Sequence, residues 1–358
     1  MRYIDAFQDG DLARKLAHAI RELIQGQEFS FMEVCGTHTV SAFRSGLRSL
    51  LPEGLELRPG PGCPVCVTPN AYLDRAIALG RSGVVLATFG DMLRVPGSSS
   101  SLLRERTRGM RVQVVYSPLD ALRLAQETDR TVVFLAVGFE TTAPAVAATV
   151  LEARRRNIHN FRVLVAHKLI PPAMQVLLED PDVRIDGFLC PGHVSVVIGS
   201  QPYRSLAEDC GVPCAIAGFE PLDMLQGIYL LARQRVEGRA EVEIAYRRAV
   251  RPEGNTKARR LIDEVFKVVD AEWRGLGWVP RSGLCLREEF WDWNAEDIPV
   301  EVEPTVEPKG CRCGEVLKGT CVPPECPLFG GACIPEHPVG ACMVSFEGAC
   351  AAWYKYGR

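Results

Sequence analysis

The sequence predicts an α/β fold, with two related parallel-sheet domains followed by a smaller C-terminal module that is helical and rich in cysteine. Three observations lead to this prediction. Short apolar runs alternate with helical patterns, three strand ends look alike, and half of the 14 cysteines fall within residues 311–358. Continuous apolar strands that alternate with helices are typical of parallel sheets covered by helices on both faces.

The individual elements follow from short β-branched runs and from helical periodicity. Strands are predicted at 29–34, 83–90, 112–116, 131–139, 162–167, 186–190 and 214–219. Helices are predicted at 118–127, 143–156 and 221–236. From about residue 255 the pattern again indicates a helix, because apolar residues recur at helical spacing at Leu261, Ile262, Val265, Phe266 and Val269.

These elements suggest three domains with approximate boundaries. The first, 1–127, contains the motifs CGTH and CPVC, and the second, 128–250, contains GFETT. The third, 251–358, is the helical, cysteine-rich module. The first two domains could also be discontinuous in sequence.

Three predicted strand ends look alike, each with a glycine beside an aromatic or acidic residue. They are ATFGDML (87–93), AVGFETTAP (136–144) and IAGFEPLDML (216–225). Open α/β sheets place ligand sites at the carboxyl ends of their strands. The repetition suggests two α/β units that face one another, although Gly-Phe at a strand-to-helix turn is also ordinary turn chemistry.

Composition narrows the function classes. The 41 basic and 44 acidic residues give a net charge of −3 and are spread along the chain, so nucleic acid is an unexpected partner. The N-terminal residues lack the apolar core of a signal peptide, and no window reaches the roughly 18 to 20 apolar residues of a membrane span. We therefore expect a cytoplasmic protein, in which clustered cysteines indicate metal or redox chemistry.

Cys35 follows the strand-like run FSFMEV, with Gly36 next and Thr37 expected to cap the following helix. A cysteine at a strand end and a helix N-terminus is an activated position. His38 is close enough in sequence to reach the same centre as a metal ligand or proton acceptor. The alternative is that Cys35 is a small core residue.

Cys63 and Cys66 form a CxxC pair in a loop rich in glycine and proline, with Thr68 as the expected cap of the next helix and Pro69 as its first residue. That helix would point backbone N–H groups at the pair and lower the thiol pKa values. The pair is interpreted as a redox dithiol, with half of a zinc site as the alternative.

Four cysteines of the tail, Cys326, Cys333, Cys342 and Cys350, lie on short turns rich in glycine and proline. An iron–sulfur cluster accepts such irregular spacing because each ligand can come from its own turn. Zinc is the chief rival, although zinc ligands usually come in closely spaced pairs. The nearest approach to such pairing is the set Cys311, Cys313 and Cys321, for which a zinc or disulfide role stays open.

Five further polar residues lie near predicted strand ends. The carboxylates are Glu33, Asp91 and Glu140, which could orient ligands or relay protons, and the imidazoles are His167 and His193. A capping, solvated or structural role is the commoner outcome for any one of them.

Taken together, the stretches FMEVCGTHT, RPGPGCPVCVTP, TFGDMLRVPGS, VGFETTAP, PGHVSVVIGS and CPLFGGACIPEHPVGACMVSFEGACAA resemble the HypD family of [NiFe]-hydrogenase maturation factors. The resemblance runs in order from about residue 29 to 354. It implies a scaffold on which the Fe(CN)2CO moiety of the hydrogenase is assembled. The implied partners are the small protein HypC, HypE with HypF as the cyanide donor and, indirectly, the hydrogenase large subunit.

The resemblance also implies residue roles. Cys35 would hold the iron together with a HypC cysteine, Cys63 and Cys66 would be the redox-active dithiol, and a [4Fe-4S] cluster would be held by Cys326, Cys333, Cys342 and Cys350. We hypothesise electron flow from the cluster through the CxxC pair to the iron at Cys35. His38 would tune the iron site, and Glu140 would assist from the facing strand end.

Two rival functions remain at this stage. A cluster-dependent reductase of protein disulfides would need Cys63 and Cys66 exposed and would not need Cys35. A zinc-stabilised binding module would carry no redox chemistry. The leading interpretation is a redox-active assembly scaffold that binds iron, cyanide and CO, rather than a conventional turnover enzyme.

Overall fold

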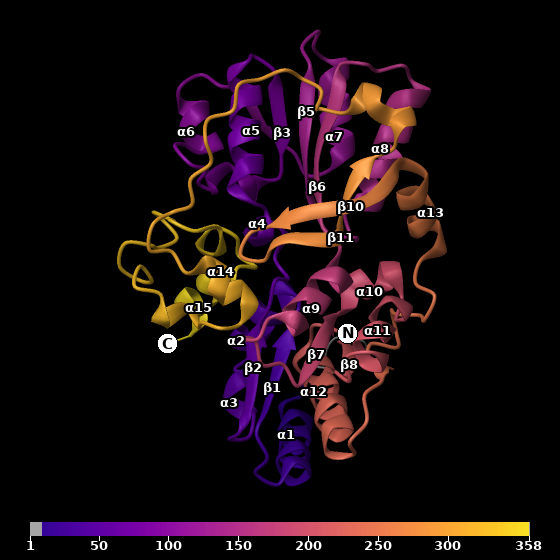
Figure 1. Ribbon diagram of the computed structural model, residues 1–358, viewed down its shortest axis with the longest axis vertical. Coiled ribbons are helices and arrows are strands. Elements are labelled where there is room, and N and C mark those ends of the chain that lie inside the picture. The colour runs from indigo at the N-terminus through magenta and orange to yellow at the C-terminus, as the bar shows by residue number, and fades with distance from the viewer. Residues whose placement is uncertain (1–8, 358) are drawn as a thin grey trace.

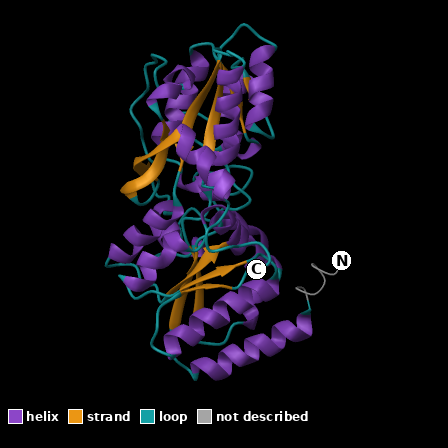
Figure 2. Cartoon of the chain, turned by 90° about the vertical axis from the view of Figure 1, so that its right-hand side faces the viewer, coloured by secondary structure: helices purple, strands orange, loops and turns teal. Residues whose placement is uncertain are grey.

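The computed structural model describes residues 9–357 and contains two parallel sheets and an antiparallel hairpin (Figure 1). One parallel sheet has the strand order β2-β1-β7-β8-β9, and the other has the order β4-β3-β5-β6. We call them the β1 sheet and the β5 sheet. Figure 2 shows them one above the other, each covered by helices. The predicted α/β class with two parallel-sheet units is confirmed.

The β1 sheet is built around strands buried on both faces. Its strands are β1 (Phe29–Glu33), β2 (Leu55–Pro59), β7 (Gly187–Pro191), β8 (Cys214–Ala217) and β9 (Val242–Ile244). Its helices are α1 (Gly10–Ile24), α2 (Gly36–Arg44), α3 (Leu47–Leu50), α10 (Gly192–Ile198), η3 (Gln201–Tyr203), α11 (Arg204–Glu208) and α12 (Pro221–Val236). Every residue of β1 and β7 is buried, which explains why these strands are mostly apolar, although β1 also buries the polar Ser30 and Glu33.

In helix α1, the sequence determines both the buried face and the N-terminal end of a helix that covers the β1 sheet. Its buried residues, Ala13, Ala17, Ile20 and Ile24, recur every three or four positions and therefore line one face, and α1 packs on α12. The Asp9 side chain accepts hydrogen bonds from the first-turn N–H groups of Asp11 and Leu12, which satisfies donors that have no partner inside the helix.

The β5 sheet contains β3 (Val85–Thr88), β4 (Val112–Val114), β5 (Val132–Gly138) and β6 (Phe161–His167). The helices of this part of the chain are α4 (Pro64–Val67), α5 (Asn70–Arg81), η2 (Gly90–Arg94), α6 (Leu102–Thr107), α7 (Pro118–Gln126), α8 (Ala143–Arg155) and α9 (Ile170–Glu179). The seven predicted strands, one of them β1, are present in the two sheets. The three helices predicted before residue 237 are also present, as α7, α8 and α12.

The two sheets are interleaved along the chain. The β1 sheet takes its strands from residues 29–59 and 187–244, whereas the β5 sheet takes all of its strands from 85–167. The expected boundary between residues 127 and 128 falls between α7 and β5, which pack on one another. In the sequence, the short helix α4 lies between β2 of the β1 sheet and β3 of the β5 sheet. In space it lies between the two sheets (Figure 1).

The helix predicted after residue 255 is shorter than the pattern indicated. Helix α13 ends at Val265, and residues 266–273 form β10 (Phe266–Trp273), which pairs antiparallel with β11 (Gly277–Leu286). The prediction of a helix across 266–273 was wrong. Phe266, Ala271 and Trp273 are buried while Val268 and Asp270 are exposed, so the strand alternates about a bulge between Val269 and Ala271.

The chain ends in a cysteine-rich module of short elements: α14 (Cys313–Lys318), η5 (Pro323–Glu325), η6 (Ala341–Met343) and α15 (Ala349–Tyr356). The short helix η4 (Glu288–Trp293) precedes this module and packs on β6 and β11. Helix α15 packs on α2, and η6 packs on α4, so the module lies beside the junction of the two sheets (Figure 1). This is the predicted C-terminal cysteine-rich helical region. Among residues 9–357, no helix is both long and apolar enough to cross a bilayer.

Candidate functional site

Cys35 lies at the carboxyl end of β1 and is itself the N-cap of α2. Thr37, the predicted cap, lies inside the helix, because α2 begins at Gly36 directly after the strand. The Cys35 side chain is 2% exposed, and this burial raises the pKa of its thiol to about 12. The backbone N–H groups of His38 and Thr37 act in the opposite direction but do not outweigh desolvation.

The imidazole in contact with the Cys35 sulfur is His193, not His38. Nε2 of His193 lies 3.3 Å from the sulfur, and its ring packs on Phe219. His38 packs near the same Phe219 ring, but its Nε2 donates to the carbonyl oxygen of Gly218 at 2.9 Å. Burial lowers the pKa of both imidazoles, to about 4 for His38, so both are neutral near pH 7. A neutral His193 can accept the thiol proton.

The C-terminal module closes this site. The Thr37 hydroxyl donates to Glu347 at 2.7 Å, and a Cβ on Gly36 would lie 2.5 Å from the Glu347 carbonyl oxygen. Burial raises the pKa of Glu347, and its charge in turn contributes to the raised pKa of Cys35. The tail therefore packs on the two residues after Cys35 and adds to the raised pKa of its thiol, of which burial is the main cause.

The CxxC loop packs directly on the backbone of Cys35. The Gly36 N–H donates to the Gly62 carbonyl oxygen at 3.1 Å, and a Cβ on Gly62 would lie 2.2 Å from the Cys35 nitrogen. Only glycine at position 62 permits this approach. Cys63 and Cys66 form a disulfide in which both residues are buried.

The helix termini around the CxxC pair differ from the prediction. Cys63 is the N-cap of the four-residue helix α4, and the Cys66 N–H points at its sulfur at 3.2 Å. Thr68 ends α4 and donates to the Pro64 carbonyl oxygen, while α5 begins at Asn70. The expected Thr68 cap was wrong, because Thr68 is used to close the short helix that contains Cys66.

Helix α4 connects the disulfide to the tail. It packs on η6, the element that contains Cys342, and the buried Arg274 donates to the Thr68 carbonyl oxygen at 2.8 Å. The positive charge of Arg274 also contributes to a lowered pKa of Cys313, for which the main causes are hydrogen bonds with the Cys311 and Cys342 thiols. The contact between α4 and η6 therefore brings the Cys63–Cys66 disulfide close to Cys342 of the tail.

Six tail cysteines line a single small cavity. The four predicted ones are there, together with two that the prediction left outside the set: Cys311, Cys313, Cys326, Cys333, Cys342 and Cys350. The Cys313 and Cys342 sulfurs lie 2.8 Å apart. Cys321 is buried but does not line this cavity.

The cavity's donor set fits an iron–sulfur cluster. In such a cluster each iron takes one thiolate, so the sulfurs surround the cluster rather than converging on a point. Within residues 9–357, no three His, Cys, Asp or Glu side chains converge closely enough to hold a metal ion. The six sulfurs, walled by Val316, Leu328 and Phe329, offer soft ligands in a dry setting.

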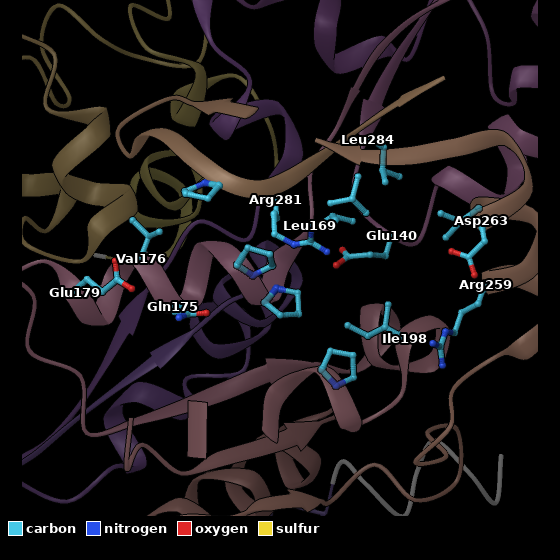
Figure 3. A pocket seen from close by; sticks show the side chains of 16 residues that line it. Glu140, Leu169, Gln175, Val176, Glu179, Ile198, Arg259, Asp263, Arg281 and Leu284 are labelled. Atoms are coloured by element: carbon cyan, nitrogen blue, oxygen red, sulfur yellow. The ribbon is translucent and has the colours of Figure 1, made fainter. Parts of the chain in front are cut away.

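Glu140 lies at the end of β5 but lines a different cavity, to which neither Cys35 nor the CxxC pair contributes (Figure 3). Two other candidates near strand ends, Glu33 and His167, do not line this cavity. Glu33 is fully buried beside Arg48, and its pKa is raised to about 7 by burial. His167 is buried and its pKa is lowered to about 3 by burial.

Comparison with known proteins identifies the family. Residues 11–357 match the HypD family model, described as the hydrogenase formation hypA family. The chain belongs to the HypD family. Among HypD relatives, "Hydrogenase maturation factor HypD" of Azotobacter vinelandii is 49% identical over 100% of this chain and 97% of its own length. The protein of the same name from Escherichia coli K12 is 45% identical, over 99% and 98%.

A more distant HypD relative is a putative hydrogenase expression/formation protein of Methanocaldococcus jannaschii. It is 44% identical over 97% of this chain and 96% of its own length. The resemblance to HypD found in the motifs is confirmed, and HypD membership supports a role in hydrogenase maturation.

Glu347 was not predicted as a site residue. Cys311 and Cys313 were left with an open zinc or disulfide role outside the proposed ligand set, and His193 was only one of several uncertain candidates. His193 lies 158 residues from Cys35, and its only signal was a histidine after a predicted strand end. Glu347 lies 310 residues from Thr37, and no local pattern could pair them. Cys313 had a signal in its CxC spacing, but its position beside Cys342 depends on tertiary structure.

Proposed function

We propose that this chain is a redox-active scaffold for assembly of the Fe(CN)2CO moiety of [NiFe]-hydrogenase. The observation that carries the proposal is the setting of Cys35: a buried thiol between a neutral imidazole and a disulfide loop that packs on its own backbone. A low-valent iron bearing cyanide and CO prefers soft thiolate ligands in a site that excludes water. Cys35 would be the ligand to this iron, which is cargo rather than a resident cofactor.

Iron binding at Cys35 requires loss of the thiol proton. Because the thiol pKa is about 12, little thiolate exists before the metal arrives, and metal binding and proton release occur together. His193 would take that proton at Nε2, 3.3 Å away. His38 packs on the same Phe219 ring as His193. Its hydrogen bond to the Gly218 carbonyl oxygen would hold Phe219, and thereby His193, in position.

Cys63 and Cys66 would store an electron pair beside the iron. Reduction adds two electrons and two protons to the disulfide and gives two thiols, and oxidation returns them. Four of the six cavity cysteines would hold a [4Fe-4S] cluster, and Cys326, Cys333, Cys342 and Cys350 are the set we propose. When bound, such a cluster supplies single electrons. Contact between α4 and η6 supports short-range transfer between the two centres.

The proposed partner proteins would supply a second thiolate and the cyanide, and would receive the product. In residues 9–357, the side-chain hydrogen-bond partners recorded for the Cys35 sulfur are His193 and Thr37, and neither is a thiol, so a second thiolate would come from a HypC-type protein. HypE, charged by HypF, would deliver cyanide, and the hydrogenase large subunit would receive the product through HypC. Because 12 cysteines are free, we place this chemistry in the reducing cytoplasm.

Burial disfavours the rival protein-disulfide reductase. Cys63 is 3% exposed and Cys66 is 0% exposed, so a protein disulfide could not reach either sulfur for attack without opening of the loop. An iron ligand covered by a partner protein needs no such exposure.

The test uses the chain co-purified without oxygen with a HypC-type partner, for the wild type, Cys35→Ser, Cys342→Ala and Cys210→Ser. Cys210 is exposed and lies outside the site, which makes it the matched control. We expect infrared cyanide and CO bands that Cys35→Ser loses and Cys210→Ser keeps. We also expect about four cluster irons with four acid-labile sulfides, lost only in Cys342→Ala. Unchanged infrared bands in Cys35→Ser, or zinc without sulfide in the wild type, would overturn the proposal.

A further inference from the structure

A cavity of about 690 Å³ lies on the side of Glu140 and is formed by α9, α13, the β10–β11 hairpin and the residues around η3 (Figure 3). Its volume is in the range that holds a small organic molecule. None of the cysteines of the iron site, the CxxC pair or the tail lines it. The assembly function therefore leaves this cavity unexplained.

Glu140 gives the cavity a polar group built into its wall. The residue is 3% exposed, and its Oε1 accepts a hydrogen bond from the Ile170 N–H at 2.9 Å. Its Oε2 has no hydrogen-bond partner. Figure 3 shows the carboxyl group pointing into the cavity. A buried carboxyl oxygen without a partner is costly, and a water molecule or a ligand in the cavity would complete its hydrogen bonding.

The other charged residues that line the cavity are two cations and two anions, so their charges cancel in number. Arg259 and Asp263 lie one turn apart on α13, and Arg281 on β11 is matched in number by Glu179 on α9. All four are exposed. Glu140 is the fifth charged residue and the only buried one, so an ionised Glu140 leaves the cavity with an uncompensated negative charge. No nearby cation is among the causes that set its pKa.

Apart from the exposed Gln175, the rest of the wall is apolar. It consists of aliphatic side chains and prolines contributed by several elements, among them Leu169, Val176, Ile198, Ile262 and Leu284. Such a wall binds the hydrocarbon part of a ligand, and the apolar surroundings of the buried Glu140 strengthen an ion pair made with it.

We infer that this cavity binds a small organic cation, with a primary ammonium or amidinium group that donates to Glu140 Oε2 and an apolar body that packs on the aliphatic wall. The cation satisfies the orphan oxygen and neutralises the one unbalanced charge. A neutral alcohol of the same size would donate a hydrogen bond to Oε2 but would not neutralise the charge. An anion would neither donate that bond nor neutralise the charge. The inference is independent of the proposed assembly function, since it requires neither iron nor a cluster.

The experiment is calorimetric titration of the full chain at pH 8 with three probes: n-hexylammonium, benzamidinium and n-hexanol. The variants are Glu140→Gln, which keeps an acceptor for the Ile170 N–H, and Glu179→Gln as a rim control that also loses one carboxylate. Circular dichroism and urea unfolding establish that each variant is folded.

We expect at least one cation to bind the wild type with at least tenfold higher affinity than hexanol. The same cation should bind Glu140→Gln at least tenfold more weakly and Glu179→Gln within about twofold of the wild type, since a buried charge-assisted hydrogen bond outweighs an exposed charge. Equal binding by hexanol, unchanged binding by folded Glu140→Gln, or no binding of either cation at millimolar concentration would each overturn the inference.

Discussion

Alanine at position 62 is expected to break the contact between the disulfide loop and Cys35. A Cβ there would lie 2.2 Å from the Cys35 nitrogen, 2.3 Å from its Cα and 2.5 Å from the Val34 carbonyl carbon. All three are backbone atoms at the end of a strand whose residues are all buried, so no side-chain rotation can relieve the clash. The loop must move away, and the Gly36 N–H then loses its bond to the Gly62 carbonyl oxygen.

The size of the effect can be estimated from these two losses. Overpacking at a rigid site costs about 1–3 kcal/mol, and a lost buried hydrogen bond adds about 1 kcal/mol. We therefore expect Gly62→Ala to lower the free energy of unfolding by about 2–4 kcal/mol. Gly331→Ala is the matched control, because a Cβ on Gly331 would have no atom within 4 Å and its φ lies outside the left-handed region. Its effect should stay within about 0.5 kcal/mol.

Two assays check this expectation. Urea unfolding followed by circular dichroism gives the stability of the two variants and the wild type under non-reducing conditions. Timed reduction with dithiothreitol, followed by alkylation and mass spectrometry, gives the rate at which the Cys63–Cys66 disulfide opens, and displacement of the loop should make this faster in Gly62→Ala only. If Gly62→Ala matched Gly331→Ala in both assays, the close packing on Cys35 could not be what holds the loop.

The remaining predictions concern the acid–base groups of the site. His193→Gln should slow iodoacetamide alkylation of Cys35 at pH 8 by tenfold or more, because the thiol loses its proton acceptor; exposed Cys210, followed by mass spectrometry in the same sample, should react unchanged. Glu347→Gln should have the opposite effect and speed alkylation of Cys35, because it removes a negative charge that raises the Cys35 pKa; a slower reaction would contradict this. Glu140→Gln should gain stability relative to the wild type as pH rises. Burial raises the Glu140 pKa from 4.5 to about 7, so the folded wild type holds a proton that the unfolded chain releases between these values, and its stability falls across that window by up to about 3 kcal/mol. Urea unfolding of both proteins at pH 4.5 and pH 8 measures the difference, and a constant difference would refute the assignment.

Local patterns in the sequence predicted most of the sheet strands because those strands are buried on both faces and read as continuous apolar runs. The exception, residues 266–273, shows the limit of the method. Val265, Phe266 and Val269 fit a helix as well as a strand, and pairing with residues 277–286 decides the outcome. That pairing, with its bulge, is tertiary information that the helical pattern upstream does not contain.

The site was predictable where its chemistry is concentrated in a motif and not where it is assembled from distant segments. Cys35 and the CxxC pair were predicted from their own loops. Identifying His193 as the imidazole on the thiol required knowing that β1 and β7 are neighbours, since each strand ends next to one of the two residues. His38, only three residues from Cys35 in the sequence, is directed away to the Gly218 carbonyl by helix α2, which begins at Gly36.

The segment 342–348 links the cysteine cavity, through six peptide bonds, to the residues that follow Cys35 on α2. Cys342, at one end, lines the cavity, and its carbonyl oxygen lies 2.1 Å from where a Cβ on Gly348 would be, so the segment is folded tightly back on itself. Between these ends, Ser345 donates to Asp91 at 3.0 Å, after the β5-sheet strand β3, and Glu347 accepts from Thr37 on α2. A loop this short and this fixed cannot shift at Cys342 without shifting at Glu347. A shift of Cys342 is therefore expected to move Glu347, whose charge contributes to the raised pKa of Cys35.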